Sequence, residues 1–210
     1  MTNRVTVEGE EKLESAVESA VDTLEAGGLV VYPTETVYGL GADALSDEAI
    51  RRVYEAKTRP RDKPLSLALP SVSSADDVAT FGSTAEEFMR RFLPGPVTPV
   101  LPKRDTVPDS LTSGSPTVGV RIPDDAVARR IAEEFGPLTS TSANVSGRGS
   151  ARTADDVDEE ILEEADLVVD SGGTEYGVGS TVVDVETWEV VREGALADDV
   201  VDWIEERNLG

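Results

Sequence analysis

Residues 29–41 read LVVYPTETVYGLG, a short apolar run that changes into a segment rich in hydroxyl groups and glycine. Residues 29–32 predict a buried strand, which Pro33 ends because proline cannot continue the hydrogen-bond ladder. Residues 34–41 predict a loop, and a polar loop at a strand end suits contact with a small polar ligand. An ordinary strand-to-helix turn explains the same stretch equally well.

Helical and strand patterns continue on both sides of this stretch. Apolar residues repeat at intervals of three and four from Leu13 to Leu24, which predicts an amphipathic helix that ends at Gly27 and Gly28. The other expected helices cover 46–59 with Ser46 as N-cap, 83–92 with a Ser83/Glu86 capping box, 126–135, a segment starting at 153, and 200–207. The other expected strands cover 65–69, 97–101, 117–122, 138–141, 167–170, 181–185 and 189–192.

This mixture of elements predicts an α/β (α+β) fold with a mixed sheet, because strands and helices do not alternate strictly. No repeat and no long linker divides the chain, so we expect one domain over residues 1–210. The loops rich in Gly, Ser and Thr predict one ligand cleft walled by the sheet. No apolar run approaches the ~20 residues that span a bilayer, and no signal-peptide core follows Met1, so we expect a cytoplasmic protein without membrane contact.

The composition narrows the possible chemistry. The chain has 42 acidic and 19 basic residues, a net charge of -23, no cysteine and no histidine. Disulfides, thiolate catalysis and a histidine base are therefore excluded. The acidic residues are spread along the chain, which favours adaptation to high salt over a disordered acidic tail or a partner-repelling surface. The same charge disfavours broad nucleic-acid binding.

Residues 57–63, KTRPRDK, form a cationic cluster in this acidic chain. Two of only four lysines, Lys57 and Lys63, lie here together with Arg59. Ammonium and guanidinium groups match phosphate in charge and geometry, so the cluster predicts an anion site. The alternative is a solvated helix C-terminus whose cations match the helix dipole.

Two further features carry polar groups beside predicted strands. Residues 140–147, STSANVSG, continue to Ser150 and offer hydroxyl and amide groups to phosphate or Mg²⁺; a flexible loop is the alternative. Arg121 and Arg192 each follow an apolar strand, where they can pair with a carboxylate or phosphate, or form a structural salt bridge. The chain contains no GxxxxGK[ST] motif, which excludes a P-loop NTPase.

Five motifs in this order resemble the YrdC/TsaC threonylcarbamoyl-AMP synthases. They are YPTETVYGLG at 32–41, KxRP at 57–60, PGPVT at 94–98, VR at 120–121 and SxN at 142–144. The resemblance covers about residues 27–194 and matches the single-domain form. It implies a YrdC-like twisted mixed sheet, flanked by helices around a deep concave cleft.

The resemblance also implies an activity and its partners. Members of the family condense L-threonine, bicarbonate and ATP into threonylcarbamoyl-AMP and pyrophosphate, with Mg²⁺ bound mainly through the ATP phosphates and no metal ligands from the protein. A downstream threonylcarbamoyl transferase complex uses the product to make N6-threonylcarbamoyladenosine in tRNA, and a weak tRNA contact is a further expectation. Other possibilities are an RNA- or tRNA-binding module of the same fold without adenylation activity, and a paralogue that uses another carbamoyl substrate.

The family's site residues carry over only where its motifs match. The implied catalytic residues are Lys57, Arg59, Ser142 and Asn144. The implied threonine-binding residues are Thr36, Arg121, Ser140 and Ser180. The implied nucleotide-binding residues are Arg59, Lys63, Thr117, Ser142, Ser150 and Arg192. The chain departs from some relatives at Ala68, which replaces a histidine, and at Lys63, which replaces an asparagine.

Overall fold

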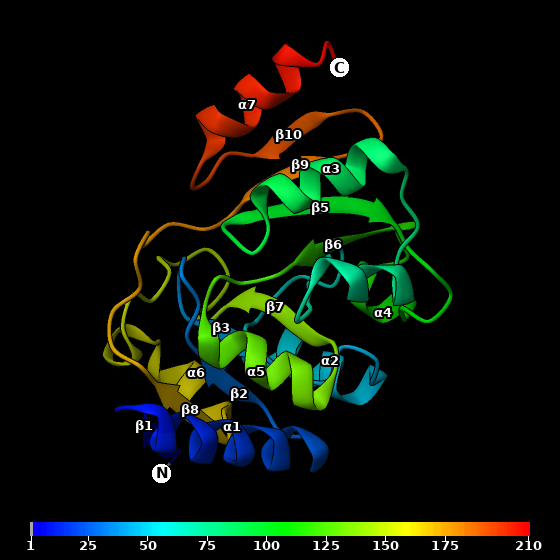
Figure 1. Ribbon diagram of the computed structural model, residues 1–210. Helices are drawn as coiled ribbons and strands as arrows, with labels where there is room; N and C mark the ends of the chain where they lie inside the picture. Colours follow the sequence, from blue (N-terminus) through cyan, green and yellow to red (C-terminus); the bar gives the residue numbers. More distant parts are fainter. Residues whose placement is uncertain (1) are drawn as a thin grey trace.

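The apolar segments assemble into one ten-stranded sheet in the computed structural model, which describes residues 2–210 (Figure 1). The strands are β1 (Asn3–Thr6), β2 (Val30–Tyr32), β3 (Gly39–Gly41), β4 (Ser66–Ala68), β5 (Val97–Pro102), β6 (Thr117–Arg121), β7 (Leu138–Ser142), β8 (Leu167–Asp170), β9 (Thr181–Asp184) and β10 (Glu189–Arg192). Their order across the sheet is β1-β8-β2-β3-β7-β4-β6-β5-β9-β10.

The sheet is mixed, as the sequence predicts. The parallel pairs are β1/β8, β2/β8, β4/β6 and β5/β9. The antiparallel pairs are β2/β3, β3/β7, β4/β7, β5/β6 and β9/β10.

Helices surround this sheet (Figure 1). They are α1 (Glu10–Glu25), α2 (Asp47–Ala56), α3 (Ser83–Phe92), α4 (Asp109–Thr112), α5 (Ala126–Phe135), α6 (Glu159–Glu164) and α7 (Ala197–Glu206), with 3₁₀ turns at Val72–Asp77 and Ala154–Asp156. Helices α1 and α5 bury small and branched residues such as Ala16, Ala20 and Ile131 in one core cluster. Near the C-terminus, Phe88 of α3 packs edge-on against Trp203 of α7, with ring centroids 5.1 Å apart. No helix in residues 2–210 is long and apolar enough to cross a membrane.

Most predicted elements form, and several coincide with their expected bounds. Helix α5 and strands β8 and β10 begin and end where the patterns predict. Ser46 caps α2 as expected, since its side chain accepts a hydrogen bond from the Ala49 N–H. Strand β1 is missed because it lies at a sheet edge with mostly exposed side chains, which leaves no apolar alternation to detect.

The predicted loop over residues 34–41 is wrong in its last part, because Gly39–Gly41 forms β3. Its glycines let β3 pass close to the ring of Tyr32 on β2: a Cβ at Gly39 would lie 2.9 Å from Tyr32 Cζ, and one at Gly41 would lie 2.8 Å from Tyr32 Cε1. A glycine-rich strand therefore forms here because of packing that the local sequence does not reveal.

Four helix termini or caps also differ from the predictions. The prediction of a Ser83/Glu86 capping box is wrong, because Gly82 occupies the N-cap position and no side chain caps the helix. Helix α2 ends at Ala56, since Thr58 adopts a φ of 47° that a right-handed helix excludes. The segment after Thr153 forms only a short 3₁₀ turn before α6, and α7 starts at Ala197.

Candidate active site

A cavity of about 530 Å³ lies against one face of the sheet. Side chains alternate across a strand, so every second residue of β6 reaches it: Thr117, Gly119 and Arg121. At the end of β7, Ser140, Thr141 and Ser142 all contribute to the lining. These strands thus bring residues far apart in the sequence onto one concave surface.

The cavity brings together nine of the predicted site residues and leaves three outside its lining. Those that line it are Thr36, Arg59, Thr117, Arg121, Ser140, Ser142, Ser150, Ser180 and Arg192. Lys57, Lys63 and Asn144 do not line it. Their predicted roles remain predictions, but direct contact of these three side chains with a ligand would need a different arrangement.

Positive charge dominates the cavity. Arg59, Arg121 and Arg192 line it, against one carboxylate, Asp184. Burial lowers the pKa of Arg59, and partial burial together with the charges of Arg121 and Arg59 lowers the pKa of Arg192. Guanidinium groups that repel one another in a partly desolvated space favour a multiply charged anion between them.

A less polar part of the lining completes this surface. Val100, Val182 and Val191 contribute to it, with Pro64 and Leu65. Apolar walls beside a few charged groups are typical of a small-molecule site that holds a ring next to charged substituents.

Backbone carbonyls fix the direction of Arg59. Its Nε donates to the Lys63 carbonyl at 3.0 Å, and its Nη2 donates to the Pro64 carbonyl at 2.9 Å. Tyr54 Oη also donates to the Lys63 carbonyl at 2.9 Å. The Lys63 side chain itself is exposed, so in this structure Lys63 acts on the cavity through its backbone.

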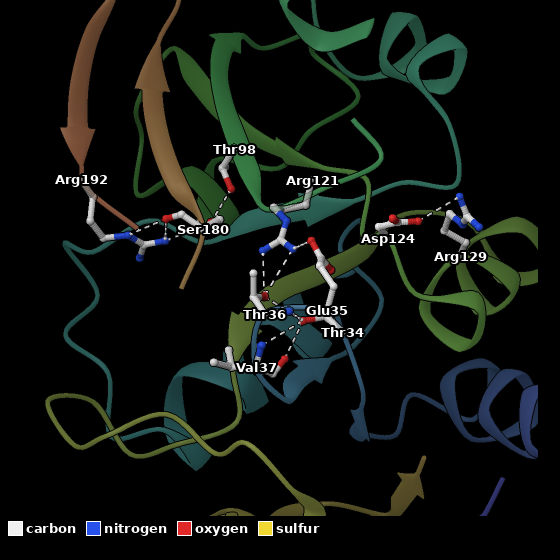
Figure 2. Close-up of polar contacts among 10 residues, drawn as sticks. All are labelled: Thr34, Glu35, Thr36, Val37, Thr98, Arg121, Asp124, Arg129, Ser180 and Arg192. Atoms are coloured by element: carbon white, nitrogen blue, oxygen red, sulfur yellow. Dashed lines mark hydrogen bonds and ion pairs between the residues drawn. The ribbon is translucent and has the colours of Figure 1, made fainter. Parts of the chain in front are cut away.

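A chain of hydrogen bonds orients Arg192 (Figure 2). Its Nη2 donates to the carbonyl of Ser180 at 2.9 Å and to Ser180 Oγ at 3.1 Å. Ser180 Oγ also shares a hydrogen bond of 2.7 Å with Thr98 Oγ1. The bonds tie the guanidinium of an edge strand to the cavity wall.

Arg121 makes the most buried ion pair of the described residues, and its partner is Glu35, which sequence reasoning missed (Figure 2). Arg121 Nη2 donates to Glu35 Oε1 at 2.7 Å, and both residues are at most 6% exposed. Nη1 and Nη2 also approach Thr36 Oγ1 at 3.5 and 3.4 Å. The only signal for Glu35 in the sequence is a carboxylate placed between two threonines directly after a buried strand.

The loop that carries Glu35 is held by its neighbours. Thr34 Oγ1 accepts from the N–H of Val37 at 3.2 Å and donates to the Val37 carbonyl at 2.6 Å. The Glu35 and Thr36 carbonyls accept from the N–H groups of Tyr176 and Gly177 at 3.0 and 2.9 Å. Local and long-range bonds therefore fix the position of the Glu35–Arg121 pair.

Lys57 lies beneath the loop that contains the SxN motif. The residue is 1% exposed, and its Nζ donates to the carbonyls of Ser142 and Asn144, the latter at 2.6 Å. Burial lowers the pKa of Lys57 to about 7, helped by the charge of Arg59 and opposed by that of Asp158. Lys57 therefore supports the loop from its inner side.

Asn144 also turns toward the loop rather than the cavity. Its Nδ2 donates to the carbonyls of Val145 at 2.8 Å and Arg148 at 3.1 Å. The Val145 N–H in turn donates to Asp158 Oδ2 at 2.7 Å. Together with Lys57, these bonds shape the backbone that presents Ser142 to the cavity.

The described residues contain no protein cage for a metal ion. No group of three or more Asp, Glu, His or Cys side chains within residues 2–210 is arranged to hold one. The serine hydroxyls along the cavity match the oxygen preference of Mg²⁺, but they are neutral. A magnesium ion would therefore need the charge of a bound ligand, such as a polyphosphate.

Known sequences that resemble this chain all point to one family. A family model described as "Sua5_yciO_yrdC: Telomere recombination" matches residues 22–194. The threonylcarbamoyl-AMP synthase of Pyrococcus abyssi is 41% identical over 181 residues, which cover 84% of this chain and 53% of the relative. The chain therefore spans about half the length of that relative. A putative threonylcarbamoyl-AMP synthase of Methanocaldococcus jannaschii is 35% identical over 189 residues, 89% of each protein.

Solved structures show the same architecture. The crystal structure of P. abyssi Sua5 complexed with L-threonine has a TM-score of 0.88 at 37% identity, covering 97% of this chain and 60% of that one. E. coli YciO has a TM-score of 0.82 at 25% identity, covering 93% and 97%. These likenesses confirm the predicted twisted mixed sheet flanked by helices.

Proposed function

This chain belongs to the Sua5, YciO and YrdC family, and we propose that it is a nucleotidyltransferase of the threonylcarbamoyl-AMP synthase type. Its substrates are L-threonine, bicarbonate and ATP, and its products are threonylcarbamoyl-AMP and pyrophosphate. The observation that carries the proposal is the cavity itself, in which three guanidinium groups and a row of hydroxyls face an apolar wall. Such a surface suits a nucleotide polyphosphate beside a small polar substrate.

The two substrates divide the cavity between them. Arg59, Arg192 and Ser142 contact the phosphates of ATP, and the valine-lined wall holds its base. Thr117 and Ser150 complete the nucleotide site. Arg121 binds the threonine carboxylate.

Thr36, Ser140 and Ser180 supply hydroxyls at the threonine end of the cavity. Lys57 and Asn144 act by shaping the Ser142 loop, in keeping with their contacts to its backbone.

The reaction needs positioning and charge neutralisation more than a protein nucleophile. The threonine ammonium first gives up a proton, and the neutral amine then attacks the carbon of CO₂ or bicarbonate. The nitrogen loses a second proton and becomes an N-carboxylate; if bicarbonate reacts directly, the hydroxide that leaves takes up one proton and departs as water. A carboxylate oxygen then attacks the α-phosphorus of ATP, and the bond from that phosphorus to the oxygen that bridges it to the β-phosphate breaks to release pyrophosphate. A magnesium ion held through the phosphates would neutralise part of their charge. The guanidinium groups of the cavity stabilise the rest, which fits a chain without cysteine or histidine.

A downstream enzyme must use the product. Threonylcarbamoyl-AMP is an activated acyl donor, so a transferase complex that modifies tRNA acts after this chain. The wider surface is acidic, which supports a weak tRNA contact at most. The net charge of -23 supports work in concentrated salt inside the cell.

Two measurements test the proposal. Pyrophosphate release at high salt is expected only when ATP, threonine and bicarbonate are all present, and mass spectrometry is expected to find threonylcarbamoyl-AMP. Arg59→Gln should lower the rate at least ~10²-fold, the scale of losing one electrostatic stabiliser. Arg61→Gln is the matched control, because Arg61 stacks on Tyr54 at 4.9 Å outside the cavity. Release without threonine, or tRNA binding without any adenylate, would argue for a different function.

A further inference from the structure

We propose that Glu35 makes the Arg121 end of the cavity selective for a zwitterion, an α-amino acid, over a ligand that carries a carboxylate alone. The inference rests on the proposed function, because it concerns the end of the cavity assigned to threonine. Glu35 is absent from the cavity lining. It would act through charge and through the orientation of Arg121, so it is a positioning and selectivity residue and not a catalytic one.

The contact between the two side chains leaves part of the guanidinium free. Only Glu35 Oε1 accepts from Arg121, through Nη2 at 2.7 Å. Glu35 Oε2 and Arg121 Nε have no hydrogen-bond partner among residues 2–210, although both are buried. The pairing is therefore single rather than forked, and the N–H groups left for a second carboxylate are those of Nη1 and Nη2, which otherwise make only long contacts to Thr36 Oγ1.

The charge balance decides which carboxylate is accepted. Glu35 and Arg121 together are neutral, so Glu35 cancels the charge that Arg121 would otherwise offer to a bare carboxylate, at a place where both residues are at most 6% exposed. Thr36, Ser140 and Ser180 add uncharged hydroxyls at this end, and the Arg192 guanidinium reaches it through its hydrogen bond of 3.1 Å to Ser180 Oγ. An α-ammonium on the ligand, which is bonded to the carbon that carries the carboxylate, adds an attraction to the negative charge of Glu35 that a bare carboxylate lacks.

The buried surroundings of Glu35 strengthen the effect of its negative charge on neighbouring groups. Asp125 lies near it, and burial raises the pKa of Asp125 to about 6, with the charge of Glu35 adding to the increase. Glu35 and Arg121 are both buried, so little water separates the charge of Glu35 from this end of the cavity. Arg59 contributes positive charge elsewhere in the cavity, where the nucleotide phosphates would use it, whereas Arg192 borders both ends because it is bound to Ser180.

The ordinary explanation is that Glu35 and Arg121 form a structural ion pair. That explanation accounts for their burial but predicts no effect on the choice between two ligands that differ only in an ammonium group. Selectivity therefore separates the two explanations, while loss of activity alone would not.

Isothermal titration calorimetry of the whole chain provides the test, with L-threonine and with 2,3-dihydroxybutyrate, in which a hydroxyl replaces the ammonium. Wild type is expected to bind threonine at least tenfold more tightly than the hydroxy acid. Glu35→Gln keeps the shape and an acceptor for Arg121 but removes the charge, and it should reduce that preference at least tenfold. Asp124→Asn is the matched control and should leave the preference unchanged, because Asp124 pairs with Arg129 at 3.7 Å on the surface (Figure 2).

The outcomes are distinct. A folded Glu35→Gln variant with the wild-type preference overturns the inference while threonine binding upholds the proposed function. If Glu35→Gln does not fold, the wild-type comparison still decides, since equal affinity for the two ligands also overturns the inference. Binding of neither ligand by wild type overturns both the inference and the assignment of threonine to this cavity.

Discussion

Replacing Lys57 by methionine tests whether a buried, easily deprotonated amine supports the Ser142 loop. Methionine has nearly the same length but no N–H group, so the carbonyls of Ser142 and Asn144 lose their shared donor. Each buried acceptor left unpaired costs about 1–3 kcal/mol. We therefore expect Lys57→Met to lower the free energy of unfolding by roughly 2–6 kcal/mol at alkaline pH, where wild-type Lys57 is neutral. The neutral amine keeps two N–H groups, which match its two carbonyl acceptors.

The size of this loss depends on pH in a defined direction. Burial lowers the pKa of Lys57 from 10.5 to about 7 in the folded protein. Below pH 7 the amine is charged in both states, and the folded protein bears the full cost of burying that charge. Between pH 7 and 10.5 the unfolded chain binds more protons than the folded chain, so the stability of wild type rises with pH. The rise is about 1.4 kcal/mol for each step of one in pH, so wild type gains about 3 kcal/mol relative to Lys57→Met between pH 6 and 9.5.

Urea unfolding of both proteins, measured at constant salt from pH 6 to 9.5, gives this difference directly. Lys103→Met controls for the loss of one lysine, since Lys103 Nζ donates to the Val107 carbonyl at 2.8 Å and pairs with Asp109 at 3.0 Å. The slope assigned to Lys57 is the part that Lys57→Met removes and Lys103→Met leaves. A difference between wild type and Lys57→Met that stays constant across this range would refute the reasoning.

Three further changes have expected outcomes. Burial raises the pKa of Asp125 to about 6, so the stability of the folded protein falls as the pH rises from about 4 to 6. Asp125→Asn keeps the N-cap acceptor for the Ala128 N–H and should raise the free energy of unfolding at pH 7.5 by up to about 3 kcal/mol. Urea titrations measure this change, and an unchanged unfolding midpoint would contradict it. Gly39→Ala places a Cβ 2.9 Å from the ring of Tyr32 and should cost about 1–3 kcal/mol by overpacking, seen as a lower melting temperature in calorimetry. Trp203→Ala empties the aromatic cluster beneath α7 and should cost about 3–5 kcal/mol, with wild-type stability in circular-dichroism melts as the contrary result.

Much of the fold follows from local patterns because most elements bury one clear face. Helix α5 places Val127, Ala128 and Ile131 inward at helical spacing, and its bounds match the prediction. Strand β3 could not be predicted in this way, since Gly39 and Gly41 are chosen for the space that Tyr32 leaves them. The cap of α3 could not be predicted from local patterns either. Gly82 has the extended backbone of an N-cap residue, and Ser83 is already the first residue of the helix.

Part of the site could be predicted from the sequence and part could not. Residue types and their position at strand ends indicate that Arg121 and Ser142 belong to one cavity, and the structure brings them together. The sequence cannot show which way a long side chain points, so it does not reveal that Lys57 turns beneath the loop. Glu35 was missed for another reason: the chain has 42 acidic residues, and nothing in the sequence shows that this one is buried.

The contrast between the cavity and the rest of the chain has a consequence for the speed of ligand capture. Arg59, Arg121 and Arg192 face inward, while the chain as a whole has a net charge of -23. An approaching polyanion first meets long-range repulsion and only then the cationic interior. Salt weakens the repulsion over a distance of about 10 Å or less but acts much less on contacts within the cavity. Association therefore becomes faster as salt is added, whereas a site on a basic surface would slow down.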